Sequence, residues 1–171
     1  NEVWSPLNEH RLPLAQLVHF AAVSIARDFR AGGYVQIGLL AATALAGLAA
    51  ARRLRGRSAP EDVLFPLLLL HWSQAENLLL DTQVCVALAL FLATLAGCAV
   101  VWTPGAPSAR RIAVVGACTL LLPLCGGFGL CPSPAFAAWI AIAGLGALRA
   151  GGRGRALGAA AWCAAYGACV A

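Results

Sequence analysis

The fold is decided by YVQIGLLAATALAGLAAA, residues 34–51, a run that contains no charged side chain. The run ends at a cluster of arginines, Arg52, Arg53, Arg55 and Arg57. A helix needs about 20 mostly apolar residues to cross the hydrocarbon core of a bilayer, and basic residues are enriched on the cytoplasmic side of such spans. This stretch therefore predicts a transmembrane helix.

The composition of the whole chain points the same way. Of its 171 residues, 61% are hydrophobic and 11% are charged, whereas a typical soluble domain carries about 25% charged residues. These charged groups are too few to cover a water-facing surface, so the composition argues against a soluble protein. We expect the lipid bilayer to be the main partner of the chain.

The net charge of +5 comes from arginine alone, because the chain has no lysine. A nucleic-acid-binding surface would need its basic residues gathered on a polar, solvated face. Here the arginines separate apolar runs instead. We expect no nucleic-acid partner and interpret the arginines as topology signals.

Five further apolar runs follow the first one, at residues 63–80, 84–102, 112–125, 135–148 and 156–171. They are rich in Leu and Ala without alternation, and backbone groups in lipid must pair within their own segment, so helices are expected. We predict an all-α polytopic membrane bundle with about five to six transmembrane helices. It forms one transmembrane domain over residues 1–171, with an outer loop and interfacial helix at 1–33 and the spans at 34–171.

The ends of the chain predict a fragment of a longer protein. The first residue is Asn1, there is no methionine, and the last run reaches Ala171 without a polar stop. We expect truncation at both ends.

The positive-inside rule gives an orientation. If residues 34–51 run from outside to inside and the later spans alternate, three loops become cytoplasmic and together hold nine of the twelve arginines. The two outer loops, around Asp81 and around Gly129, hold none. We predict a multi-pass protein of the bacterial inner membrane with its arginine-rich loops in the cytoplasm.

The N-terminal segment has a different pattern. At 100° per residue, one face of a helix over residues 12–30 collects apolar side chains, and Gln16, His19, Arg27 and Arg30 share the opposite face. Pro13 fits the first turn of this helix. The pattern predicts an interfacial helix on the outer side, with a short, steeply tilted span as the alternative.

Two polar strings could carry chemistry. Polar side chains within a span are costly and usually face a cavity or a partner. If this stretch is a helix, one arc of its surface holds His71, Gln74, Asn77 and Asp81, and another side holds Glu76 and Gln83. The arc indicates a wet cleft open to the outside, unless the span ends at Trp72 and the rest is a solvated loop.

The second string is Asn8-Glu9-His10-Arg11, directly before the interfacial helix. Glu9 could act as a general base, His10 could shuttle a proton or bind a divalent metal ion, and Arg11 could hold a phosphate. Taken alone, such a string is also typical of a solvated loop.

Together, the two strings resemble a known family. The string from Asn8 to Leu14 resembles an "NEHRI-x-x-P-R-L"-like segment in a family of uncharacterised bacterial multi-span proteins that look like GT-C-class glycosyltransferases. The stretch from Leu70 to Asn77, with Gln83 beyond, is similar to that family's "S-x-x-Q-W-E-N…G-x-Q" segment. Ala75 stands where the family commonly has tryptophan, and the acidic pair typical of its first outer loop would precede Asn1.

The resemblance implies an activity and a set of site residues. It implies inverting transfer of a sugar from a polyprenyl-phosphate donor to an acceptor at the outer face, with Glu9 and His10 as catalytic residues. The planar guanidinium group of arginine suits bidentate contacts with phosphate. Attraction to anionic lipid headgroups explains Arg27 and Arg30 at least as well. The substrate- and phosphate-binding residues would be Asn8, Arg11, Arg27, Arg30, His71, Gln74, Glu76, Asn77, Asp81 and Gln83.

Two other classes of function fit the same residues. A multi-span transporter or flippase would line its substrate path with the arc that contains His71 and Gln74, and a membrane scaffold would use no chemistry. Transporters often carry charged residues at mid-depth in broken spans. Here the polar residues lie toward one end of a span, which favours a site at the outer face.

The cysteines show no metal-binding spacing. Five of the seven lie within apolar runs, where cysteine behaves as a small hydrophobe. Cys125 and Cys131 flank a glycine-rich turn, where they are either two reduced thiols or, on an oxidising side, a disulfide.

Overall fold

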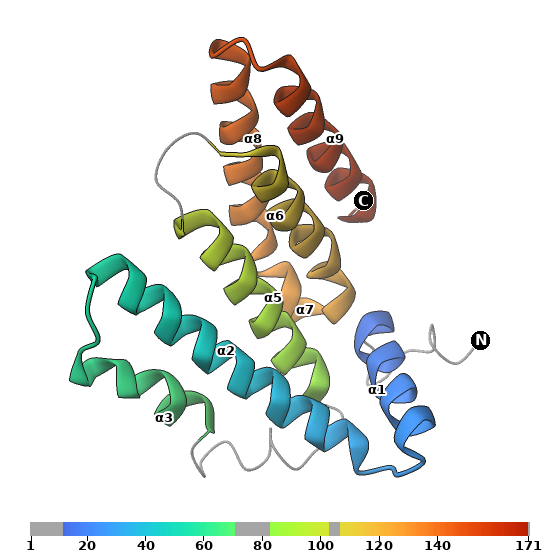
Figure 1. The fold of residues 1–171 in the computed structure, drawn as a ribbon. Helices are drawn as coiled ribbons and strands as arrows, with labels where there is room; N and C mark the ends of the chain where they lie inside the picture. The colour runs from blue at the N-terminus through green and yellow to red at the C-terminus, as the bar shows by residue number, and fades with distance from the viewer. Residues whose placement is uncertain (1–11, 71–82, 103–106, 171) are drawn as a thin grey trace.

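A computed structural model describes residues 12–70, 83–102 and 107–170 of the chain (Figure 1). Over these ranges the regular secondary structure is helical, with no strand, which confirms the all-α prediction. In chain order, the elements are α1 (Pro13–Ala26), α2 (Ala31–Arg55), η2 (Pro60–Val63), α3 (Leu64–Leu70), α5 (Val84–Val101), α6 (Ala109–Leu121), η5 (Pro123–Cys125), α7 (Gly127–Leu130), α8 (Ser133–Arg149) and α9 (Arg153–Val170).

Among the described residues, three segments are long and apolar enough to cross a membrane: α2, α5 and the α7–α8 segment Gly127–Arg149. This is fewer than the five to six spans predicted. The run at 112–125 forms α6, which has 13 residues and is therefore about 20 Å long. Helix α9 has Arg153 and Arg155 in its first turn, and the run at 63–80 is described only as far as Leu70.

The helices are arranged so that the arginine-rich segments share one end of the bundle. Helices α2 and α5 run parallel: the Cys98 thiol lies 3.7 Å from the carbonyl oxygen of Ala46, and the Arg53 guanidinium lies 5.9 Å from the centre of the Trp102 ring. Helices α6, α8 and α9 then alternate in direction (Figure 1). Helices α2, α5 and α8 finish at one end of the bundle, where α6 and α9 begin, and we call this the arginine end. The opposite end is called the α1 end.

The core lies where α5, α6, α8 and α9 meet. Leu92, Ile112, Val115 and Ile140 are buried there together. Small residues allow close packing: a Cβ added at Gly116 of α6 would collide with the indole ring of Trp162 of α9. Helix α6 is therefore the central element of the bundle, although it is too short to span a bilayer by itself.

The glycine-rich turn after α6 depends on two particular glycines. Pro123 begins η5, and Gly126 then adopts φ +83°, a conformation that side chains with a Cβ rarely take. A Cβ at Gly129 would overlap the backbone carbonyl of Leu122. Both positions require glycine for the chain to fold back into α7 and α8.

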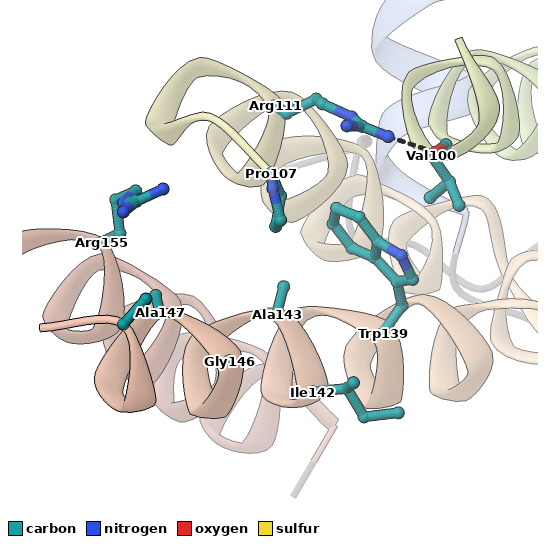
Figure 2. Close-up of a pocket in the computed structure, with 10 residues that line it drawn as sticks. Val100, Pro107, Arg111, Trp139, Ile142, Ala143, Gly146, Ala147 and Arg155 are labelled. Carbon is teal, nitrogen blue, oxygen red and sulfur yellow. Dashed lines mark hydrogen bonds between the residues drawn. The ribbon is translucent and has the colours of Figure 1, made fainter. Parts of the chain in front are cut away.

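Arg111 links three helices at the arginine end (Figure 2). Its Nε donates a hydrogen bond to the carbonyl oxygen of Ala99 at 2.6 Å, and its Nη2 donates to that of Val100. These are among the last carbonyls of α5, which have no partner within their own helix. The same guanidinium lies 5.9 Å from the centre of the Trp139 ring on α8, so a single α6 side chain fixes the end of α5 against α8.

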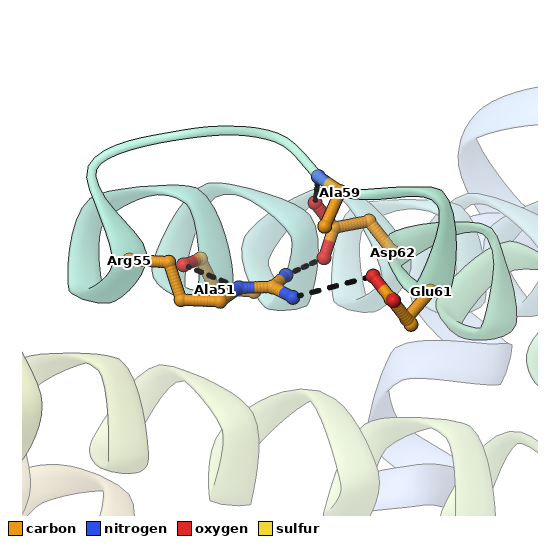
Figure 3. A network of polar contacts seen from close by, with 5 residues as sticks. All are labelled: Ala51, Arg55, Ala59, Glu61 and Asp62. Atoms are coloured by element: carbon orange, nitrogen blue, oxygen red, sulfur yellow. Dashed lines mark hydrogen bonds and ion pairs between the residues drawn. The ribbon is translucent and has the colours of Figure 1, made fainter.

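The connection between α2 and α3 is held by a second polar network (Figure 3). Arg55 pairs with the nearly buried Asp62 and lies 3.9 Å from the carboxylate of Glu61. Asp62 also accepts a hydrogen bond from the backbone N–H of Ala59 at 2.9 Å. The network uses both acidic residues of η2 to hold one arginine, so Arg55 has a structural partner and is not simply a free surface charge.

Candidate functional site

The structure describes three of the predicted site residues, Arg27, Arg30 and Gln83. The others lie outside the described residues: Asn8, Glu9, His10, Arg11, His71, Gln74, Glu76, Asn77 and Asp81.

The chain segments that follow the two polar strings meet at the α1 end. Leu12 and Ala15, at the start of α1, are buried together with Cys85 near the start of α5. Leu12 directly follows Arg11 in the sequence, and Cys85 comes two residues after Gln83. A Cβ at Gly126 would also collide with Leu12, so the start of α1 is enclosed by α5 and by the glycine-rich turn.

Gln83 is half-buried and lies at the N-cap position of α5. Its side chain makes no capping hydrogen bond there. It is thus positioned at the same end of α5 as Cys85, while Arg27 and Arg30 lie on the connection between α1 and α2.

Arg27 and Arg30 form an exposed basic corner. Arg27 ends α1 in the left-handed conformation, with φ 53°, which is uncommon for a residue other than glycine. The backbone N–H of Arg30 donates to Asp28 at 2.9 Å, and its guanidinium lies 5.7 Å from the centre of the Phe29 ring. Within the described part of the chain neither guanidinium has an ion-pair partner.

Helix α1 has a mixed inward face, on which Ala15 is buried and Leu14 and Val18 pack against the core. Gln16 and His19 are half-buried, whereas Leu17 and Ile25 are exposed, Ile25 to 85%. Large apolar side chains on its outward face suit a helix in contact with lipid. A helix with Pro13 in its first turn confirms that part of the sequence prediction, but the helix ends at Ala26 and not at Arg30. Arg27 and Arg30 therefore lie beyond the helix and not on a face shared with Gln16 and His19.

Sequence reasoning missed a buried polar residue, Gln36 on α2. It is 1% exposed, and among the described residues neither of its side-chain polar atoms has a hydrogen-bond partner; the Nδ1 atom of His19 on α1 is likewise buried without one there. A buried unpaired amide costs about 1–3 kcal/mol and usually has a functional reason in a membrane helix. The signal in the sequence was the single amide in the apolar run from Tyr34.

The described residues supply few acids for catalysis. Glu61 and Asp62 pair with Arg55 at the arginine end, and Asp28 accepts a hydrogen bond from the backbone of Arg30. Over residues 12–70, 83–102 and 107–170, no three His, Cys, Asp or Glu side chains gather as a metal site would require. The predicted base, Glu9, lies outside these ranges.

A cavity of about 440 Å³ opens at the arginine end (Figure 2). It lies between the beginning of α6, the last turns of α8 and the beginning of α9. Arg111 and Arg155 line it together with Trp139 and a largely apolar wall. From the sequence alone, these arginines indicate only the membrane topology.

Comparison with protein-family models, curated proteins and solved structures found no match for this chain.

Proposed function

We propose that this chain is the membrane part of a bacterial inner-membrane enzyme that transfers a sugar from a polyprenyl-phosphate donor at the extracytoplasmic face. In this proposal the arginine end faces the cytoplasm and the α1 end faces outward. The runs at 63–80, 112–125 and 156–171 complete a multi-pass domain around the three spans.

The observation that carries this proposal is the packing of Leu12 against Cys85. It brings the start of α1 beside the start of α5, and these are the points where the two polar strings join the described helices. Strings so far apart in the sequence would then contribute to one site. The family resemblance rests on these same strings.

The proposed reaction divides its tasks among residues at the α1 end. Glu9 takes the proton from the acceptor hydroxyl, whose oxygen forms the new bond to the anomeric carbon. The bond from that carbon to the phosphate oxygen of the donor breaks, and polyprenyl phosphate leaves with both electrons of the broken bond. Arg11, next to Leu12 at the start of α1, stabilises the departing phosphate, because guanidinium forks bind its oxygens in pairs. Arg27 and Arg30 lie at the other end of the 14-residue helix, about 20 Å away, and attract anionic headgroups instead.

The direct test is transfer of a radiolabelled sugar from a polyprenyl phosphate by full-length protein in proteoliposomes. We expect Glu9→Gln to lower the rate by at least about a hundredfold, as removal of a general base typically does. Arg11→Ala should lower it by about tenfold or more. Glu61→Gln is the matched control, because Glu61 is an exposed acid at the arginine end, and it should retain the wild-type rate.

Unchanged transfer by both Glu9→Gln and Arg11→Ala would remove the first string from the site. Absence of transfer by the wild-type protein with every polyprenyl-phosphate sugar offered would count against the enzyme itself.

A transporter or flippase is the second candidate, favoured by the unpaired buried amide of Gln36. Polar groups inside a bundle mark substrate paths in transporters. Movement of a labelled polyprenyl-phosphate sugar across vesicle membranes without transfer to an acceptor would identify this activity. Gln36→Leu should then slow that movement, whereas the control Thr43→Val, on the same face of α2 but with its hydroxyl bonded to the carbonyl of Leu39, should not.

A further inference from the structure

The cavity at the arginine end combines two positive charges with an apolar wall. Its charged lining residues are Arg111 of α6, whose side chain runs toward Val100, and Arg155 of α9 (Figure 2). Trp139, Ala143 and Ala147 of α8 form much of the wall. An occupant suited to this cavity therefore combines negative charge for the two guanidinium groups with apolar surface along α8.

The two guanidinium groups are available to an anion. The described part of the chain contains no carboxylate within ion-pair distance of either one. Arg111 uses Nε and Nη2 for the carbonyls of Ala99 and Val100, and an arginine has five N–H donors, so its Nη1 group remains for a ligand. Arg155 is folded back over the start of its own helix, where its Nη2 would lie 2.8 Å from a Cβ at Gly152.

The apolar wall continues onto the outer surface of α8. Ile142 lines the cavity and is also 68% exposed, and the neighbouring Leu145 is exposed as well. A small soluble anion would gain nothing from this surface. A phospholipid would fill both parts, with its phosphate between the arginines and its acyl chains along Ile142 and Leu145.

We infer that this cavity binds the headgroup phosphate of an anionic glycerophospholipid. Arginine pockets between helix ends are suited to such headgroups, and the tight coupling of Arg111 to α5 and Trp139 holds the receiving group in place. The bound lipid would sit at the end of the bundle opposite the proposed transfer site, so the two sites can be tested separately.

The test measures lipid binding to purified full-length protein by native mass spectrometry, with a phosphatidylglycerol titrated into delipidated samples. Arg155→Gln should weaken binding by about tenfold, because one charge-assisted contact is lost. Gly146→Leu should weaken it similarly by filling the cavity; a Cβ at Gly146 meets nothing within 4 Å, so this variant keeps the arginines and the helix packing.

Two control variants match these changes. Arg153→Gln removes an exposed arginine that does not line the cavity, and Gly158→Leu adds a side chain at another open glycine. Both should bind phosphatidylglycerol within about twofold of wild type. Circular dichroism melting in the same detergent confirms that each variant is folded.

Three results would overturn the inference. Equal weakening by Arg153→Gln and Arg155→Gln would mean that the lipid responds only to diffuse surface charge. Equal affinity for phosphatidylcholine would remove the requirement for an anionic headgroup. Displacement of phosphatidylglycerol by inorganic phosphate at the same concentration would identify a soluble anion as the ligand.

Discussion

Cys125 and Cys131 lie close in sequence but have opposite surroundings. Both thiols are free, Cys125 fully buried at the end of η5 and Cys131 exposed. The thiolate is the reactive form of cysteine, and burial both disfavours it and blocks access to reagents, so Cys125 should be inert while the protein is folded.

We therefore predict that iodoacetamide at pH 8 modifies Cys131 within minutes and leaves Cys125 intact, as peptide mass spectrometry of the folded protein in detergent would show. Labelling of Cys125 should rise when the protein is denatured. Equal labelling of the two thiols at pH 8 would contradict the burial of Cys125.

The turn after α6 provides a sharper residue-scale prediction. Gly129→Ala places a methyl group against the Leu122 carbonyl, which is backbone and cannot rotate away. We expect a loss of about 1–3 kcal/mol or more in the free energy of unfolding. Gly127→Ala is the control two residues earlier, where a Cβ meets nothing within 4 Å. Thermal unfolding in one detergent compares the two, and equal melting temperatures would refute the close approach.

At the scale of elements, Arg111 provides the test of how α5 is held. Arg111→Gln removes the donors that satisfy the carbonyls of Ala99 and Val100 and should cost about 1.5–3 kcal/mol, the usual contribution of a hydrogen bond to a charged group. Arg110→Gln, at the exposed neighbouring position, should cost less than about 0.5 kcal/mol. Denaturant unfolding of both variants measures the difference, and equal costs would show that Arg111 does not stabilise α5.

The sequence predicted the bounds of a helix well wherever the ends of the apolar run coincided with the residues that cap the helix. The predicted run at 84–102 is α5 almost residue for residue. The run at 112–125 was placed too late, because Ser108 accepts a hydrogen bond from the N–H of Arg111 and starts α6 earlier, while Pro123 begins a different element. Hydropathy alone detects neither a serine cap nor the turn chemistry that ends a helix.

The site was less predictable than the helices. The helical periodicity predicted that Gln16 and His19 share one face of α1. It did not predict whether that face points inward, because this depends on which helices pack against α1. Arg111 and Arg155 line one cavity because α6 packs against α9, and no local sequence pattern encodes that packing. In the sequence, both arginines therefore indicate only the membrane topology.

At the scale of the whole molecule, the arrangement predicts one orientation for all arginine-rich segments. Cysteines introduced at Arg57, Ser108 and Arg153 should be protected from a membrane-impermeant maleimide in intact cells, and one at Asp28 should be labelled. Cys131 and Cys169, the exposed native thiols, are replaced by serine in this experiment. Labelling at any of the first three positions in intact cells would refute the cytoplasmic orientation.

The bridge made by Arg111 has a consequence for assembly. Its guanidinium belongs to α6, its acceptors belong to α5, and the same two helices share the core through Leu92 and Ile112. Preformed helices associate within a bilayer through such contacts, so recognition between the two halves does not require a peptide link. Residues 1–102 and 107–171, produced as two separate polypeptides in one cell, should recombine and be recovered together through a tag on either piece.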